Sequence, residues 1–155
     1  MNIIKERALI AELNQKINEY CNKYLLFCGG CCYSAYVLSK YLTLLGVHHK
    51  IAIFQDHDIL NETNFNKAIN GRGVAHVAIQ VRHKCRKMYI GDCTGLFKYF
   101  ESTGEPFKIR TYPSVNPKEL LDAYNHNDWN WTYDPVHNQA LHKAIKKIYL
   151  KFAEI

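Results

Sequence analysis

The spacing of apolar residues predicts several helices and a group of short strands. Apolar side chains recur at every third or fourth position in four segments, which is the period of an amphipathic helix. These segments are residues 3–24, Cys31–Leu45, Pro117–Tyr124 and about Val136–Phe152. Gly46 provides a stop signal for the second helix, because glycine readily adopts the left-handed conformation that ends many helices.

Alternation of apolar with polar or small residues predicts strands in the middle of the chain. The expected strands are His49–Gln55, Ala75–Val81, Lys87–Asp92 and Lys108–Tyr112. The polar, glycine-containing segment 56–73 is expected to form a loop or an irregular insert. Two helices, a set of antiparallel strands and a final helix indicate an α+β fold. No repeat or linker interrupts residues 1–155, so we expect one domain.

Composition narrows the class of protein. Hydrophobic residues make up 48% of the 155 residues and charged residues 22%, which is typical of a globular domain and excludes a mainly disordered chain. No apolar run reaches the roughly 18 residues of a membrane span. Charged residues in Met1–Arg7 occupy the place where a signal peptide needs apolar ones, so we expect a cytoplasmic protein without a membrane partner.

The net charge of +6 gives a mild preference for acidic partners. The positive residues are scattered, with small clusters at Arg82–Lys87 and Lys143–Lys151. A solvated surface accounts for this pattern, and no nucleic-acid-binding motif accompanies it. We therefore do not expect a nucleic-acid partner, and the sequence leaves the oligomeric state open.

The cysteines are the first candidates for chemistry. There are six of them: Cys21, Cys28, Cys31, Cys32, Cys85 and Cys93. Without a signal peptide, free thiols in a reducing compartment are favoured over disulfides. Cys31 opens a predicted helix, where the helix dipole and unpaired backbone N–H groups favour a thiolate.

A histidine and an aspartate are expected to face each other across a hairpin. If the strands at 75–81 and 87–92 are joined by a three-residue loop, His83-Lys84-Cys85, then His76 lies directly opposite Asp92. Cross-strand neighbours have Cβ atoms about 5 Å apart, so the carboxylate could orient the imidazole. A slip of one residue would turn Asp92 to the other face of the sheet.

These residues resemble a known family. Gly29-Gly30-Cys31 is followed by "LG" at Leu45-Gly46, with Gly46 fifteen residues after the cysteine. This pattern resembles the nucleophile helix of the transglutaminase-like branch of papain-like cysteine hydrolases. The strand that begins at His76 and the strand that ends at Asp92 are similar to the next two elements of that family. The resemblance covers about residues 27–95.

The resemblance implies a papain/transglutaminase-like fold, in which the nucleophile helix packs on a small antiparallel sheet with flanking helices. It implies a triad of Cys31, His76 and Asp92 that attacks an amide of a peptide, protein or glutamine side chain through a thioester, without metal or cofactor. Gly30, Trp129 and Trp131 are candidate substrate-binding residues, although the tryptophans also suit a core.

Other interpretations stay open. Cys32 would be the nucleophile if the chain followed the arylamine N-acetyltransferase pattern, in which one residue separates Gly-Gly from the cysteine. Cys28 and Cys31 could form a thiol-disulfide redox module with a facing Pro113. Cys28, Cys31, Cys85 and Cys93 could bind zinc. Finally, Cys31 and His76 could be core residues of a non-catalytic interaction protein.

Overall fold

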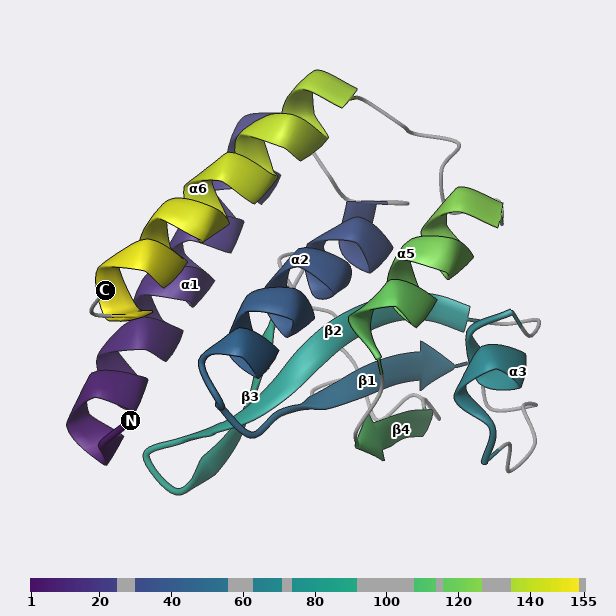
Figure 1. The fold of residues 1–155 in the computed structure, drawn as a ribbon. Coiled ribbons are helices and arrows are strands. Elements are labelled where there is room, and N and C mark those ends of the chain that lie inside the picture. The colour runs from purple at the N-terminus through teal and green to yellow at the C-terminus, as the bar shows by residue number, and fades with distance from the viewer. Residues whose placement is uncertain are drawn as a thin grey trace.

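The protein packs a layer of helices on one side of a four-stranded antiparallel sheet (Figure 1). The computed structural model describes residues 1–24, 30–55, 63–70, 74–91, 108–113, 116–126 and 135–153. The elements are α1 (Ile3–Tyr24), α2 (Gly30–Leu44), β1 (Lys50–Gln55), α3 (Phe65–Ile69), β2 (Val74–His83), β3 (Arg86–Ile90), β4 (Lys108–Pro113), α5 (Pro117–His126) and α6 (Pro135–Ala153). The predicted α+β class is therefore confirmed.

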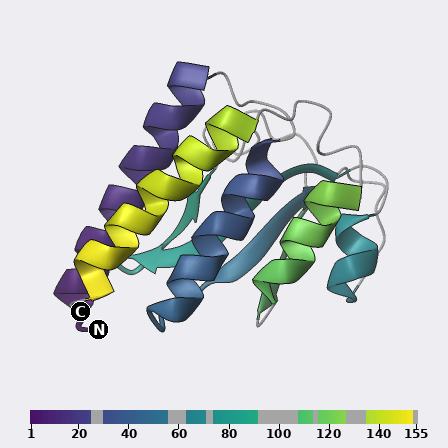
Figure 2. The ribbon, with the colours of Figure 1, turned by 45° about the horizontal axis from the view of Figure 1, so that its top comes forward.

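The sheet has the strand order β3-β2-β1-β4, and each neighbouring pair is antiparallel. The pairing of β1 with β2 runs from Lys50 opposite Gln80 to Gln55 opposite Val74. Helix α2 packs on β2 and lies between α5 and the α1–α6 pair (Figure 2). The expected packing of this helix on a small antiparallel sheet is thus present.

The two faces of the sheet carry different apolar clusters because side chains alternate along each strand. Ile53 and Val77 belong to the main core, together with buried residues of α1, α2, α5 and α6. Ala52, Phe54 and Ala78 form a smaller cluster of their own, with Tyr89 and Ile109 packed against it. The first face of the sheet therefore supports the helices, and the second face has a separate set of contacts.

The long helices α1 and α6 pack together, and the two chain termini lie at the same end of this pair (Figure 1). Residues spaced by three or four positions, such as Leu13 and Ile17 of α1 and Leu141 and Ile145 of α6, are buried to 2% exposure or less. This confirms the helical periodicity of both segments. No helix in the described part of the chain is long and apolar enough to cross a membrane.

The turn at Gly46 terminates helix α2, as the sequence predicts. Gly46 has φ +70°, its N–H donates to Thr43 O over 3.1 Å, and the Val47 N–H donates to Leu42 O over 2.9 Å. These two bonds form a Schellman motif, in which glycine avoids the steric cost of the left-handed conformation. The motif reverses the chain between α2 and β1.

The segment 56–73 is not irregular throughout, so this expectation is wrong for Phe65–Ile69, which form helix α3. Asn64 is its N-cap, and the Asn64 side chain accepts a hydrogen bond from Lys67 N over 3.1 Å. Phe65, Ala68 and Ile69 are buried, which is the i, i+3, i+4 pattern of one helical face. Residues 56–62 and 71–73 lie outside the described part.

The β2–β3 hairpin differs by one residue from the predicted register. Arg82 pairs with Lys87 and His83 with Arg86, so the loop has two residues rather than three. Lys84 and Cys85 have φ values of +52° and +63°. Positive φ at both loop residues is typical of a type I′ turn, whose twist matches that of the flanking strands. The predicted three-residue loop is therefore wrong, and so is the register from which Asp92 was placed opposite His76.

Candidate functional site

Cys31 lies in the first turn of α2, and this turn is at the end of the sheet where β2 begins. Because the Gly46 turn reverses the chain, α2 runs back along β1 (Figure 1). A 15-residue helix is about 22 Å long, and the six residues of β1 span about 20 Å. The start of α2 is thus near the level of Gln55 and its partner Val74.

His76 is the third residue of β2, at that same end of the sheet, and its side chain is only 4% exposed. It lies opposite Phe54. The two rings meet edge to face, with 5.2 Å between centroids and an angle of 86°. Phe54 and Ala78, two of the fully buried residues of the smaller cluster, share this face of the sheet.

The fold therefore brings Cys31 and His76 to one end of the sheet but directs the His76 ring to the second face. Val77, the next residue along β2, joins the core beneath α2, and neighbouring strand residues point to opposite faces. The Cys31 side chain lies outside what the structure describes, so contact between its sulfur and the imidazole stays a prediction.

Asp92 also lies outside the described residues. Strand β3 ends with Ile90 opposite Ile79, and Gly91 follows with φ +91°. A residue with this φ leaves the extended conformation of the strand, so the alternation of β3 cannot be carried on to Asp92. The role of Asp92 as the partner of His76 stays a prediction that no longer rests on a cross-strand pair.

Cys32 is a core residue rather than a candidate nucleophile. It has no exposed surface, and its Sγ donates to Leu120 O over 3.4 Å. This contact joins α2 to α5, which pack against each other along their length (Figure 2). A thiol with this position has no access to a substrate from solvent. Of the two candidates, Cys32 is therefore excluded as the nucleophile, and the role of Cys31 stays a prediction.

Two alternatives required residues that the structure places at the far end of the sheet. Cys85 is exposed in the β2–β3 turn, beyond the Lys50 end of β1 (Figure 1). Pro113 of β4 pairs with Lys50, at that same end. Neither residue is near the start of α2, so a zinc site including Cys31 and Cys85 and a redox site with Pro113 facing Cys31 are both disfavoured. In the described part, no group of three or more metal-ligating side chains occurs.

The other site residues expected from the sequence have few described features. Gly30 is the first residue of α2. Trp129, Trp131, Cys28 and Cys93 lie outside the described residues.

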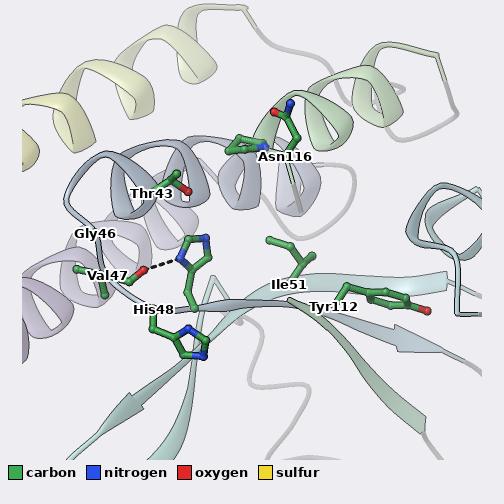
Figure 3. Close-up of a pocket in the computed structure, with 9 residues that line it drawn as sticks. Thr43, Gly46, Val47, His48, Ile51, Tyr112 and Asn116 are labelled. Carbon is green, nitrogen blue, oxygen red and sulfur yellow. Dashed lines mark hydrogen bonds between the residues drawn. The ribbon is translucent and has the colours of Figure 1, made fainter. Parts of the chain in front are cut away.

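A cavity of about 600 Å³ lies at the opposite end of α2, beside its C-terminal turn. Figure 3 shows Thr43, His48, Tyr112 and Asn116 around it. His49 also lines this cavity, with Nδ1 2.9 Å from Val47 O and Nε2 2.8 Å from Ser39 Oγ.

The hydrogen bonds of His49 define its tautomer. A carbonyl only accepts, so Nδ1 carries the proton and Nε2 accepts from the Ser39 hydroxyl. Burial lowers the pKa of His49 despite the bond to Val47 O, which acts in the opposite direction. Ser39 is itself fully buried, so this Ser–His pair ties α2 to the start of β1 and presents no nucleophile to solvent.

A second half-buried histidine connects α6 to α2. His142 Nε2 lies 2.8 Å from the Tyr41 hydroxyl, and Nδ1 lies 3.4 Å from the Tyr33 hydroxyl. Burial is the main cause that lowers the pKa of His142, and the positive charges of Lys40 and Lys146 lower it further. Burial also raises the pKa of Tyr41, which keeps the phenol protonated as a donor to the imidazole.

Sequence reasoning assigned no role to His49 or His142. The partners of His142 precede it in the chain by 101 and 109 residues, so no local pattern could reveal the pair. The closer pair of Ser39 and His49 is separated by the helix end and its turn. The sequence signal for Ser39 was its position, because it is a polar residue on the apolar face of the predicted second helix.

Comparisons with protein-family models, with curated proteins and with solved structures find no match to this chain.

Proposed function

We propose that the protein is a cysteine-dependent hydrolase or acyl transferase that acts on an amide through Cys31. The main support for this proposal is that α2 and β2 begin at the same end of the sheet. The helix that begins at Gly30-Cys31 packs on the strand that carries His76, and both elements begin at the same end of the sheet. The helix dipole and the unpaired backbone N–H groups of the first turn favour the thiolate form of a cysteine located there.

The proposed reaction proceeds by acyl transfer to sulfur. His76 accepts the proton of the Cys31 thiol, and the sulfur attacks the carbonyl carbon of the amide. The tetrahedral intermediate collapses, the C–N bond breaks, and the imidazolium donates its proton to the leaving amine. Water or a second amine then attacks the thioester and releases the Cys31 thiol. The Cys31 backbone N–H would donate to the oxyanion.

This mechanism requires the His76 imidazole to contact the Cys31 sulfur. The imidazole must meet the sulfur at the end of the sheet, beside the start of β2, although its ring contacts Phe54 on the second face. Because the His76 side chain is only 4% exposed, the imidazolium formed during the reaction requires a neighbouring carboxylate. The proposal assigns that part to Asp92, which follows the end of β3 by two residues.

Trapping the thioester tests the proposal. p-Nitrophenyl acetate is mixed with the protein, and intact-mass spectrometry with peptide mapping locates the acetyl group. We expect rapid acetylation of Cys31 with release of nitrophenol, lost in Cys31→Ser and slowed at least about 100-fold in His76→Gln. Cys85→Ser and His48→Gln are matched controls at exposed positions and should leave the rate unchanged.

The burial of His76 favours a second candidate, a non-catalytic interaction protein. A histidine packed edge-on against Phe54, with Ala78 beside it, is also what a structural core residue would show. In that case Cys31 would be acetylated no faster than the exposed thiol of Cys85. His76→Gln would lower the stability of the fold without changing the acetylation rate of Cys31. The same experiment therefore separates the two functions.

A further inference from the structure

A groove with positively charged borders lies between α1 and α6. Its volume is about 860 Å³. Ala140, Ala144 and Ile148 recur every four residues along α6 and lie in this groove. Residues spaced by four share one face of a helix, and the two alanines leave space there because their side chains are small. The base of the groove is thus apolar.

Lysines border this apolar base. Lys143, Lys147 and Lys151 follow one another at intervals of four residues on α6, and Lys16 lines the groove from α1. The two helices lie side by side, so their lysines belong to one surface (Figure 1, Figure 2). Successive lysines of α6 are about 6 Å apart along the helix axis.

Within the described residues, only part of this charge is paired with a carboxylate. Lys151 Nζ lies 3.1 Å from both carboxylate oxygens of Glu12, and Lys16 pairs with Glu19. Lys143 and Lys147 are exposed, and neither has an acidic partner among the residues that the structure describes. Two positive charges beside an apolar groove therefore remain available to an external anionic group.

We propose that this groove binds an acidic amphipathic helix of a partner protein. The apolar stripe of such a helix would cover the alanines, and its flanking Glu or Asp residues would pair with Lys143 and Lys147. A second copy of this chain is a poor occupant, since the net charge is +6 on each copy. The apolar base favours a helix with an apolar stripe over a nucleic-acid backbone.

Fluorescence anisotropy with a designed probe tests this docking site. The probe is a labelled peptide of about 18 residues, with leucines on one helical face and glutamates on both sides of them. We expect saturable binding to the full chain that weakens at least tenfold in Lys143→Glu/Lys147→Glu, roughly as expected for reversing two contacting charges. Lys67→Glu/Lys118→Glu, at exposed lysines of α3 and α5, is the matched control and should bind normally.

A second variant separates shape from charge. Ala144→Phe fills the groove without changing the charge, and we expect it to weaken the peptide at least about fivefold. A scrambled peptide of equal charge should bind at least about tenfold more weakly than the amphipathic one.

Three results would overturn the proposal: no binding of the amphipathic peptide, equal binding of the scrambled one, or equally tight binding of single-stranded oligothymidine that Ala144→Phe leaves unchanged. The last of these would assign the surface to nucleic acid.

Discussion

Replacing the two residues of the β2–β3 turn should stabilise the protein and would test the observed register. Lys84 and Cys85 occupy left-handed conformations, with φ of +52° and +63°. Both residues are exposed. The double variant Lys84→Asn/Cys85→Gly installs the pair that a type I′ turn prefers. If the loop had three residues, as the sequence alone suggested, this pair would not match it.

The expected gain can be estimated from the backbone alone. A left-handed conformation costs an L-residue roughly 1–2 kcal/mol. Asparagine tolerates it better than lysine, and glycine has no such cost. Glycine also gives the unfolded chain more freedom, which removes about 0.5–1 kcal/mol of the gain. We therefore expect a net increase of about 1 kcal/mol in the free energy of unfolding and a rise of about 3 °C in Tm.

Urea titration followed by circular dichroism measures this change. Cys85→Ser is the control, because it removes the thiol but keeps a side chain at the same φ. It should leave the free energy of unfolding within about 0.5 kcal/mol of the parent value. An unchanged or lower midpoint in Lys84→Asn/Cys85→Gly would refute the two-residue turn. It would also reopen the pairing that places Asp92 opposite His76.

Two further predictions concern the helix end and the half-buried histidines. Gly46→Ala should lower the free energy of unfolding by about 1 kcal/mol, and Gly46→Asn by about half as much. The cost comes only from the positive φ, because a Cβ added at Gly46 meets nothing within 4 Å. Equal urea midpoints for both variants and the parent would contradict this prediction. The pKa values of His49 and His142 lie below the ordinary 6.5, so the folded state binds fewer protons than the unfolded one. The contribution of the two neutral histidines to stability is therefore complete above about pH 6.5 and is lost as the pH falls through the lowered pKa values. The urea midpoint should decline between about pH 7 and 5. The decline should be smaller in His49→Asn/His142→Gln.

The arrangement of helices and strands was largely predictable because burial imposes a local period. The helix ending at Gly46 shows this best, since both the apolar face and the stop signal are in adjacent residues. The short helix at Phe65–Ile69 was missed because one turn with an Asn64 cap carries little periodicity. The hairpin register was missed because Lys84 and Cys85 are uncommon residues for a type I′ turn.

The candidate site was less predictable than the fold. Spacing in the sequence placed Cys31 at a helix start and His76 on the adjoining strand, and both placements are confirmed. The face to which His76 points was not inferred, although Val77 and Ile79 identify the core side of β2 and leave His76 on the other. The Phe54–His76 contact depends on pairing between strands that are distant in sequence, which no local pattern specifies.

The most direct test of the proposed nucleophile is the reactivity of Cys31 as a function of pH. Iodoacetamide labelling with peptide mapping gives the rate at Cys31 and, in the same sample, at the exposed Cys85. A thiolate held by the helix start and His76 predicts fast labelling of Cys31 that persists well below about pH 8, with Cys85 slowing there as an ordinary thiol does and His76→Gln abolishing the difference. If Cys31 instead labels no faster than Cys85 at every pH, or is unaffected by His76→Gln, the cysteine–histidine pair does not exist.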